Sequence, residues 1–113
     1  MHEMSLAGGV ARIIEEQATT HGFSKVLTVR LEIGQLAHVD ADALSFCFSA
    51  VVKNTVAEGA KLVIERAQGL VWCFGCATQV AIKAWGDACP SCGSFDLKAA
   101  SGQDMRILDL EVA

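Results

Sequence analysis

The sequence predicts an α+β protein with a small two-helix, three-stranded sheet body and an inserted zinc-ribbon-like lobe. Apolar residues recur at helical spacing in two segments and alternate with polar residues in three others. Both periodicities fail between residues 69 and 102, where glycines and cysteines concentrate. We therefore expect one α+β domain made of residues 1–68 and 103–113, and a second domain at residues 69–102.

Two segments in the first half of the chain have the pattern of amphipathic helices. The first covers residues 5–21, with Ser5 as a candidate N-cap and Gly22 as a candidate stop. The second follows Asp40, a candidate cap, and ends near Asn54. Their apolar stripes consist of Leu6, Val10, Ile13, Ile14 and Ala18 in the first helix, and of Leu44, Cys47, Phe48, Val51 and Val52 in the second.

Three segments alternate with the period of two that is typical of half-buried strands. In residues 25–34, one set of side chains is apolar and the other polar: Leu27, Val29, Leu31 and Ile33 against Thr28, Arg30 and Glu32. A turn at Glu58-Gly59 precedes a second strand through Leu62 and Ile64. The third strand covers residues 105–112, where leucine and valine alternate with acidic residues.

Composition and charge exclude several classes of protein. The 113 residues are 52% hydrophobic and 19% charged, which suits one domain carrying a small module. A net charge of -4 argues against a nucleic-acid binder, which needs a basic face to contact phosphates. No apolar run approaches the roughly 20 residues of a membrane span, and no export signal begins the chain. We therefore expect a cytoplasmic protein that binds neither membrane nor nucleic acid.

Four of the five cysteines form two pairs with the spacing of a metal site. The pairs are Cys73-x2-Cys76 and Cys89-x2-Cys92, and twelve residues separate them. Two intervening residues form a turn, known as a rubredoxin knuckle, that lets both sulfurs of a pair reach one ion. Four thiolates suit tetrahedral Zn(II). A structural zinc site is therefore predicted.

Three other chemistries were weighed for these cysteines. A rubredoxin-like iron site uses similar ligands, but the chain has no other redox feature. A thioredoxin-like disulfide needs only one pair beside a βαβ pattern, and a catalytic zinc keeps an open position that four cysteines would close.

Gly75 and Gly93 are expected to supply backbone freedom in the knuckles. Cys47 lies on a helical apolar stripe and is expected to be a core residue.

The first residues offer a second, different set of ligands. The α-amine of Met1 and the deprotonated amide of His2 can close a five-membered ring on a metal, and the His2 imidazole can close a six-membered one. Nitrogen donors in a plane suit Ni(II) or Cu(II), with Glu3 available beside them. The alternative is a solvated terminus with an incidental histidine, and His21 and His38 are expected to be structural or incidental.

Three stretches of the chain carry a specific resemblance. "MHEMSL" at the start, "LEIGQLAHVDADALSFCF" in the middle, and "CFGC…CPSCGS" before the final strand appear in this order. Together they resemble the HypA/HybF family of hydrogenase maturation nickel metallochaperones. The resemblance covers essentially the whole chain.

The resemblance implies a carrier and not an enzyme. It implies delivery of Ni(II) to the large subunit of [NiFe]-hydrogenase, together with a GTPase of the HypB type. Some family members also serve urease, which adds urease accessory proteins as partners. The implied sites are transient nickel at Met1, His2 and Glu3, and structural Zn(II) at Cys73, Cys76, Cys89 and Cys92.

Two rival functions belong to other classes. A zinc-ribbon module that binds protein or nucleic acid, without nickel transfer, is the alternative. An enzyme is not expected, because the sequence has no glycine-rich phosphate loop, no nucleophile motif and no open metal site.

Overall fold

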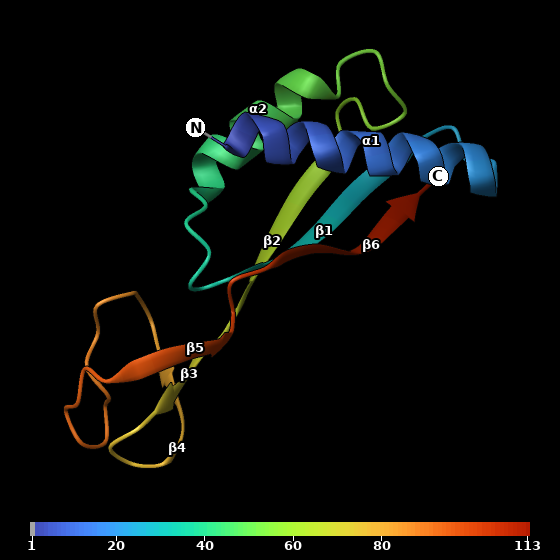
Figure 1. Ribbon diagram of the computed structural model, residues 1–113. Helices are drawn as coiled ribbons and strands as arrows, with labels where there is room; N and C mark the ends of the chain where they lie inside the picture. Colours follow the sequence, from blue (N-terminus) through green and yellow to red (C-terminus); the bar gives the residue numbers. More distant parts are fainter. Residues whose placement is uncertain (1) are drawn as a thin grey trace. The chain divides into compact units, whose positions relative to one another are not determined.

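The computed structural model describes residues 2–113, which form two helices and six strands. In chain order these elements are α1 (Glu3–His21), β1 (Val26–Gly34), α2 (Ala41–Val51), β2 (Lys61–Ala67), β3 (Gly69–Cys73), β4 (Thr78–Ile82), β5 (Leu97–Ser101) and β6 (Met105–Val112). The strands form two three-stranded sheets, ordered β2-β1-β6 and β4-β3-β5 (Figure 1). The predicted α+β class and the body's three-stranded sheet are confirmed.

The second sheet was not predicted. Strands β3, β4 and β5 lie in the segment where the sequence shows no strand periodicity. They are only five residues long, and half of their side chains are small or polar. Apolar and polar residues therefore do not alternate clearly enough to predict a strand.

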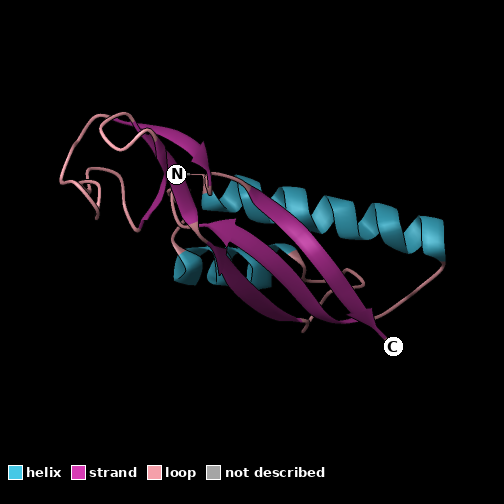
Figure 2. Cartoon of the chain, turned by 90° about the horizontal axis from the view of Figure 1, so that it is seen from below, coloured by secondary structure: helices cyan, strands magenta, loops and turns pink. Residues whose placement is uncertain are grey.

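The chain divides into two compact units. Among the described residues, unit 1 comprises residues 2–31, 39–64 and 107–113, and unit 2 comprises residues 32–38 and 65–106. Both helices lie on one face of the β2-β1-β6 sheet (Figures 1 and 2).

The core of unit 1 is formed by the helices and the central strand β1. Its buried apolar residues include Ala7, Val10, Ile14 and Ala18 of α1, Leu44, Cys47 and Phe48 of α2, and Val26, Val29 and Leu31 of β1. The predicted stripes are largely correct. Ile13 is the exception, because it lies at the edge of the α1 stripe and its side chain is 44% exposed.

The helix ends show which sequence signals were informative. Asp40 caps α2, because its carboxylate accepts the amide of Ala43 at 3.0 Å. Gly22 ends α1 in the left-handed conformation, as predicted. Ser5 is not the N-cap of α1, because the helix already begins at Glu3 with His2 in the capping position. The second helix ends at Val51, before the predicted Asn54.

Polar side chains connect the central strand β1 to its neighbour β6. Residue numbers rise along β1 as they fall along β6, so the two strands are antiparallel. The paired atoms are Thr28 Oγ1 and Glu111 Oε1 at 3.0 Å, Arg30 Nη1 and Asp109 Oδ2 at 2.7 Å, and Arg106 Nε and Glu32 Oε1 at 3.0 Å.

Three glycines in unit 2, Gly34, Gly69 and Gly102, let separate backbone segments contact one another directly. We call these three residues the glycine contact. A Cβ on Gly34 would overlap the carbonyl of Gly102, and a Cβ on Gly102 would lie 2.6 Å from the Cα of Gly69. The carbonyl of Gly102 also accepts the amide of Leu36 at 2.8 Å. Three separate passages of the chain can approach this closely only where side chains are absent.

The core of unit 2 is small. β3 is its central strand and pairs antiparallel with both β4 and β5. Leu36, Val71 and Ile82 are buried, with Val80 and Leu97 packed against them. So few apolar residues give limited stabilisation.

We expect Gly102→Ala to destabilise the protein far more than Gly86→Ala. Both glycines have positive φ, +87° and +93°, but only Gly102 has backbone atoms where its Cβ would lie. The conformational cost of about 1–2 kcal/mol is common to both, and overlap adds about 1–3 kcal/mol at Gly102 alone. Thermal unfolding of the two purified variants measures the difference. Equal loss of stability would show that the glycine contact is unimportant.

Candidate metal centres

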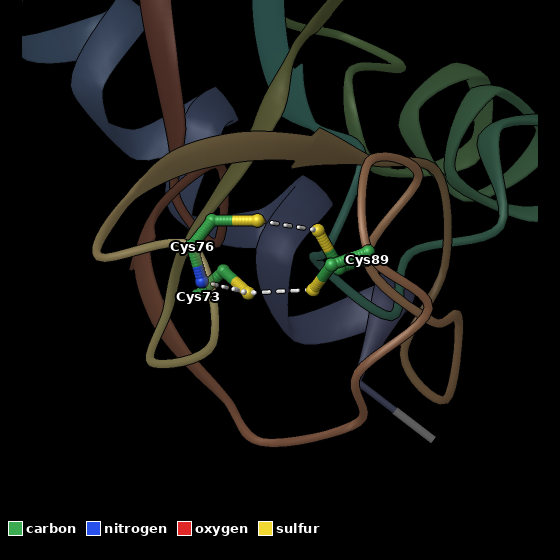
Figure 3. Close-up of side chains that lie close together, drawn as sticks. Cys73, Cys76 and Cys89 are labelled. Atoms are coloured by element: carbon green, nitrogen blue, oxygen red, sulfur yellow. Dashed lines mark hydrogen bonds between the residues drawn. The ribbon is translucent and has the colours of Figure 1, made fainter.

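The four paired cysteines converge on one point in unit 2. Cys73 is the last residue of β3, Cys76 lies in the β3–β4 turn, and the other two lie between β4 and β5. Their four sulfur atoms lie within 4.8 Å of one another, and Figure 3 shows Cys73 and Cys76 facing Cys89. The pairing of Cys73 with Thr78 closes the hairpin and places the first knuckle at its tip.

The sulfur spacing fits a tetrahedral metal ion. The Sγ atoms of Cys73 and Cys92 are 3.6 Å apart, and those of Cys76 and Cys89 are 3.8 Å apart. Four sulfurs at about 2.3 Å from zinc form a tetrahedron with edges of about 3.8 Å. Each close pair joins one knuckle to the other, so a bound ion would connect both.

The backbone of the knuckles donates a hydrogen bond to a sulfur, adopts tight turns and leaves space for the sulfurs. The amide of Cys76 donates to Cys73 Sγ at 3.4 Å. Gly93 has a φ of +77°, as expected, whereas the positive φ in the first knuckle belongs to Ala77. Gly75 instead provides space, because a Cβ there would lie 3.2 Å from Cys92 Sγ.

The electrostatics of the cluster favour a thiolate at Cys89 and disfavour thiolates at Cys73 and Cys76. The amide of Cys92, helped by that of Ser91, lowers the pKa of Cys89 to about 6. The side chains of Cys92 and Cys89, together with burial, raise the pKa of Cys76 to about 12. The amide of Cys76 lowers the pKa of Cys73, but burial and the Cys92 and Cys89 side chains outweigh it and raise that pKa overall. Four thiolates here therefore need a cation.

The four candidate ligands differ in their exposure to solvent. Cys73 and Cys89 are buried, Cys76 is half-buried, and Cys92 is exposed. An ion held by all four would therefore be reachable from solvent at Cys92 and, less easily, at Cys76.

The predicted nitrogen ligands lie at the start of α1 in unit 1. The His2 side chain is 53% exposed, and its Nδ1 lies 3.8 Å from Glu3 Oε1. The carbonyl of His2 accepts the amide of Leu6 at 2.9 Å and so begins the helix. Met1, the remaining predicted ligand, lies outside the described residues.

Glu3 is a buried carboxylate with a partner on the second helix. Its Oε2 accepts the backbone amide of Asp40 at 3.1 Å, which joins the first turn of α1 to the start of α2. This hydrogen bond and one from the backbone amide of Glu3 itself hold the pKa of Glu3 below its ordinary value of 4.5, and the charge of the nearby His2 acts in the same direction. Burial opposes the shift. The carboxylate therefore stays ionised at neutral pH.

Sequence analysis missed the contact between Glu3 and Asp40. Asp40 was expected only as a helix cap, and 37 positions separate it from Glu3. No local pattern reports such a contact, because it depends on how the two helices pack.

The remaining candidates agree with their expected roles. Cys47 is buried in the core of unit 1. Within residues 2–113, the four cysteines are the one group of three or more side chains arranged to hold a metal ion, so neither His21 nor His38 joins such a group. In the described part of the chain, no helix is both long and apolar enough to cross a bilayer.

Comparison with known proteins identifies the family of this chain. Residues 1–112 match the family described as "Hydrogenase/urease nickel incorporation, metallochaperone, hypA". The chain is 48% identical over 112 residues to hydrogenase maturation factor HypA of Azotobacter chroococcum, and 50% identical over 112 residues to that of Bradyrhizobium sp. (strain ORS 278). Each alignment covers 99% of both proteins.

The fold is also similar to solved structures. The solution structure of the nickel metallochaperone HypA from Helicobacter pylori superposes with a TM-score of 0.70 at 25% identity, covering 99% of this chain and 97% of that one. A second solution structure of a HypA protein gives a TM-score of 0.72 at 26% identity, covering 100% and 97%. The chain belongs to the HypA family of nickel metallochaperones for hydrogenase and urease maturation, whose members are carriers and not enzymes.

Proposed function

We propose that this metallochaperone binds Ni(II) at its N-terminus, through the α-amine of Met1 and the backbone amide and imidazole of His2, with Glu3 beside them. The observation that carries the proposal is the position of His2, exposed at the first turn of α1. The first four amides of a helix have no intrahelical acceptor. The amide nitrogen of His2 can therefore lose its proton to a metal without breaking a helical hydrogen bond.

The same position favours release of the cargo. The N-terminus of a helix carries about half a positive charge, which repels a cation. The deprotonated amide and the ionised Glu3 supply negative charge that offsets this repulsion. Binding is thus strong enough to select a metal that prefers planar nitrogen ligands, but the site is shallow and open to a partner.

Glu3 is proposed to hold the site in place as well as to supply charge. One of its oxygens accepts the Asp40 amide, while the other faces the His2 imidazole. The nickel ligands are thereby connected to the core of unit 1 at both helices.

The four cysteines are proposed to hold a structural Zn(II). Thiolates and the sulfur spacing fit zinc, and the ion would stabilise a lobe with few buried apolar residues. This proposal keeps two functional domains, zinc binding at residues 69–102 and nickel binding at residues 1–68 and 103–113.

The partners are proposed from the family. The relatives are named hydrogenase maturation factors, which supports the [NiFe]-hydrogenase large subunit as the target. A GTPase of the HypB type is proposed to act with the carrier, and the family description supports urease accessory proteins as further partners. Five cysteines without a disulfide support a cytoplasmic location.

His2→Ala should abolish tight nickel binding, because it removes the imidazole and with it one chelate ring. A short N-terminal extension should do the same, because it turns the α-amine into an amide. Isothermal titration of zinc-loaded protein with Ni(II) measures both.

His21→Ala is the matched control, since it removes an exposed histidine from the other end of α1. It should bind nickel like the unchanged protein. Indistinguishable affinities for all of these proteins would refute the N-terminal site.

Removing zinc with a chelator should unfold the cysteine lobe and leave the helices of unit 1 intact, because few apolar residues support the lobe. Amide signals of residues 69–101 should lose dispersion in NMR spectra, while the helical circular dichroism persists. Elemental analysis should find one zinc per chain, lost in Cys73→Ser and kept in Cys47→Ala. An intact lobe without metal, or iron in place of zinc, would contradict this assignment.

The contribution of Glu3 to stability should disappear in acid. Its folded pKa lies below 4.5, so the ionised carboxylate stabilises the fold above that value, and this is lost as pH falls through the folded pKa. Glu3→Gln should therefore lower the melting temperature of unit 1 more at about pH 6 than at about pH 3, because protonation of the carboxyl increases as the pH falls through its folded pKa. Glu16→Gln, exposed on the same helix, is the control. An equal effect at both pH values would contradict an ionised Glu3.

A further inference from the structure

A cavity of about 370 Å³ in unit 2 has an unusual lining for an acidic protein. Its walls come from the end of β1, the β2–β3 connection and the end of β4. The lining residues are Gln35, Arg66, Gln68, Ala81, Ile82 and Lys83. No residue of either candidate metal centre is among the lining residues, and the cavity does not depend on the proposed nickel function.

The polar groups of this cavity suit an anion. An arginine, a lysine and two glutamines are among the lining residues, and no aspartate or glutamate is. In the described part of the chain, neither Arg66 nor Lys83 forms a side-chain ion pair. Glu65 precedes Arg66 on β2, so strand alternation directs it to the opposite face.

The floor of the cavity is rigid. Ile82 is 6% exposed and packs with Leu36 and Val71 in the core of unit 2. The amide of Gln35 donates to the carbonyl of Ala67 at 2.8 Å, which holds the end of β1 against the β2–β3 connection. The two glutamines therefore project from fixed backbone.

The loop that carries Lys83 is also fixed. Asp87 Oδ2 accepts the amides of Lys83 and Ala84, each at 3.2 Å. The Trp85 indole donates to the carbonyl of Leu36 at 2.9 Å and fastens the loop to the core of unit 2. Asp87 itself is not among the residues that line the cavity.

We propose that this cavity binds a small oxyanion, a phosphate or a carboxylate group, between Arg66 and Lys83. Arg66 supplies a planar pair of donors that matches either group, and Lys83 adds a point charge. Gln35 and Gln68 supply further neutral donors. A cavity of this size holds one such group and a few attached atoms, and the open side leaves room for the rest of the molecule that carries it.

Titration of the zinc-loaded, full-length protein tests the site by NMR at constant ionic strength. Inorganic phosphate and succinate are the two probes, and chloride is the blank. Saturable shifts should appear at the amides of residues 35, 66, 68 and 81–83. The probe that saturates the site at the lower concentration shows whether the cavity prefers a phosphate or a carboxylate group.

Two variants decide whether the lining residues are responsible. Arg66→Gln with Lys83→Gln should weaken binding of the saturating probe at least about tenfold, as expected for lost charge-assisted hydrogen bonds. Lys98→Gln is the matched control, because Lys98 is an exposed cation of the same unit that does not line the cavity. Linear, chloride-like shifts for both probes, or equal weakening by Lys98→Gln, would overturn the proposal.

Discussion

The glycine contact is the constraint on which the architecture of unit 2 depends. Gly34 ends β1, Gly69 begins β3 and Gly102 follows β5, and the contacts of Gly102 with the other two glycines are between backbone atoms. Any side chain there would separate these passages and break the bond from Leu36 to the Gly102 carbonyl. Leu36 could then not reach the core that it shares with Val71 and Ile82. The rigid floor of the basic cavity and the β3 strand that carries Cys73 both rest on this packing.

The cysteine cluster and the proposed N-terminal site lie in different electrostatic environments. The cysteine cluster is assembled by a β-hairpin and a loop, and its thiols oppose multiple ionisation until a cation enters. The proposed N-terminal site begins with an exposed His2 on a helix whose dipole disfavours cations. The proposed roles, a metal that stays and a metal that is handed on, thus match opposite environments in one small chain.

Local chemistry explains what could be predicted from the sequence. Long amphipathic segments gave both helices and three strands, Asp40 and Gly22 marked helix ends, and cysteine spacing predicted the cluster. The short strands β3, β4 and β5 were not predicted, because apolar and polar residues do not alternate clearly along them. Contacts between distant residues, such as Glu3 with Asp40 and Gly34 with Gly102, escaped because they arise from packing and leave no local pattern. Gly34, Gly69 and Gly102 carry no sign of their shared contact in the sequence.

The close sulfur pairs have a consequence for the polymer. Because Cys73 contacts Cys92 and Cys76 contacts Cys89, an ion held by all four would close the intervening chain into a ring, as a covalent cross-link would. The entropy of a closed loop changes only slowly with its length. Added length between the pairs would therefore cost little closure entropy, provided that the contacts of Asp87 and Trp85 are kept. The two residues inside each pair, by contrast, are fixed by the reach of the sulfurs.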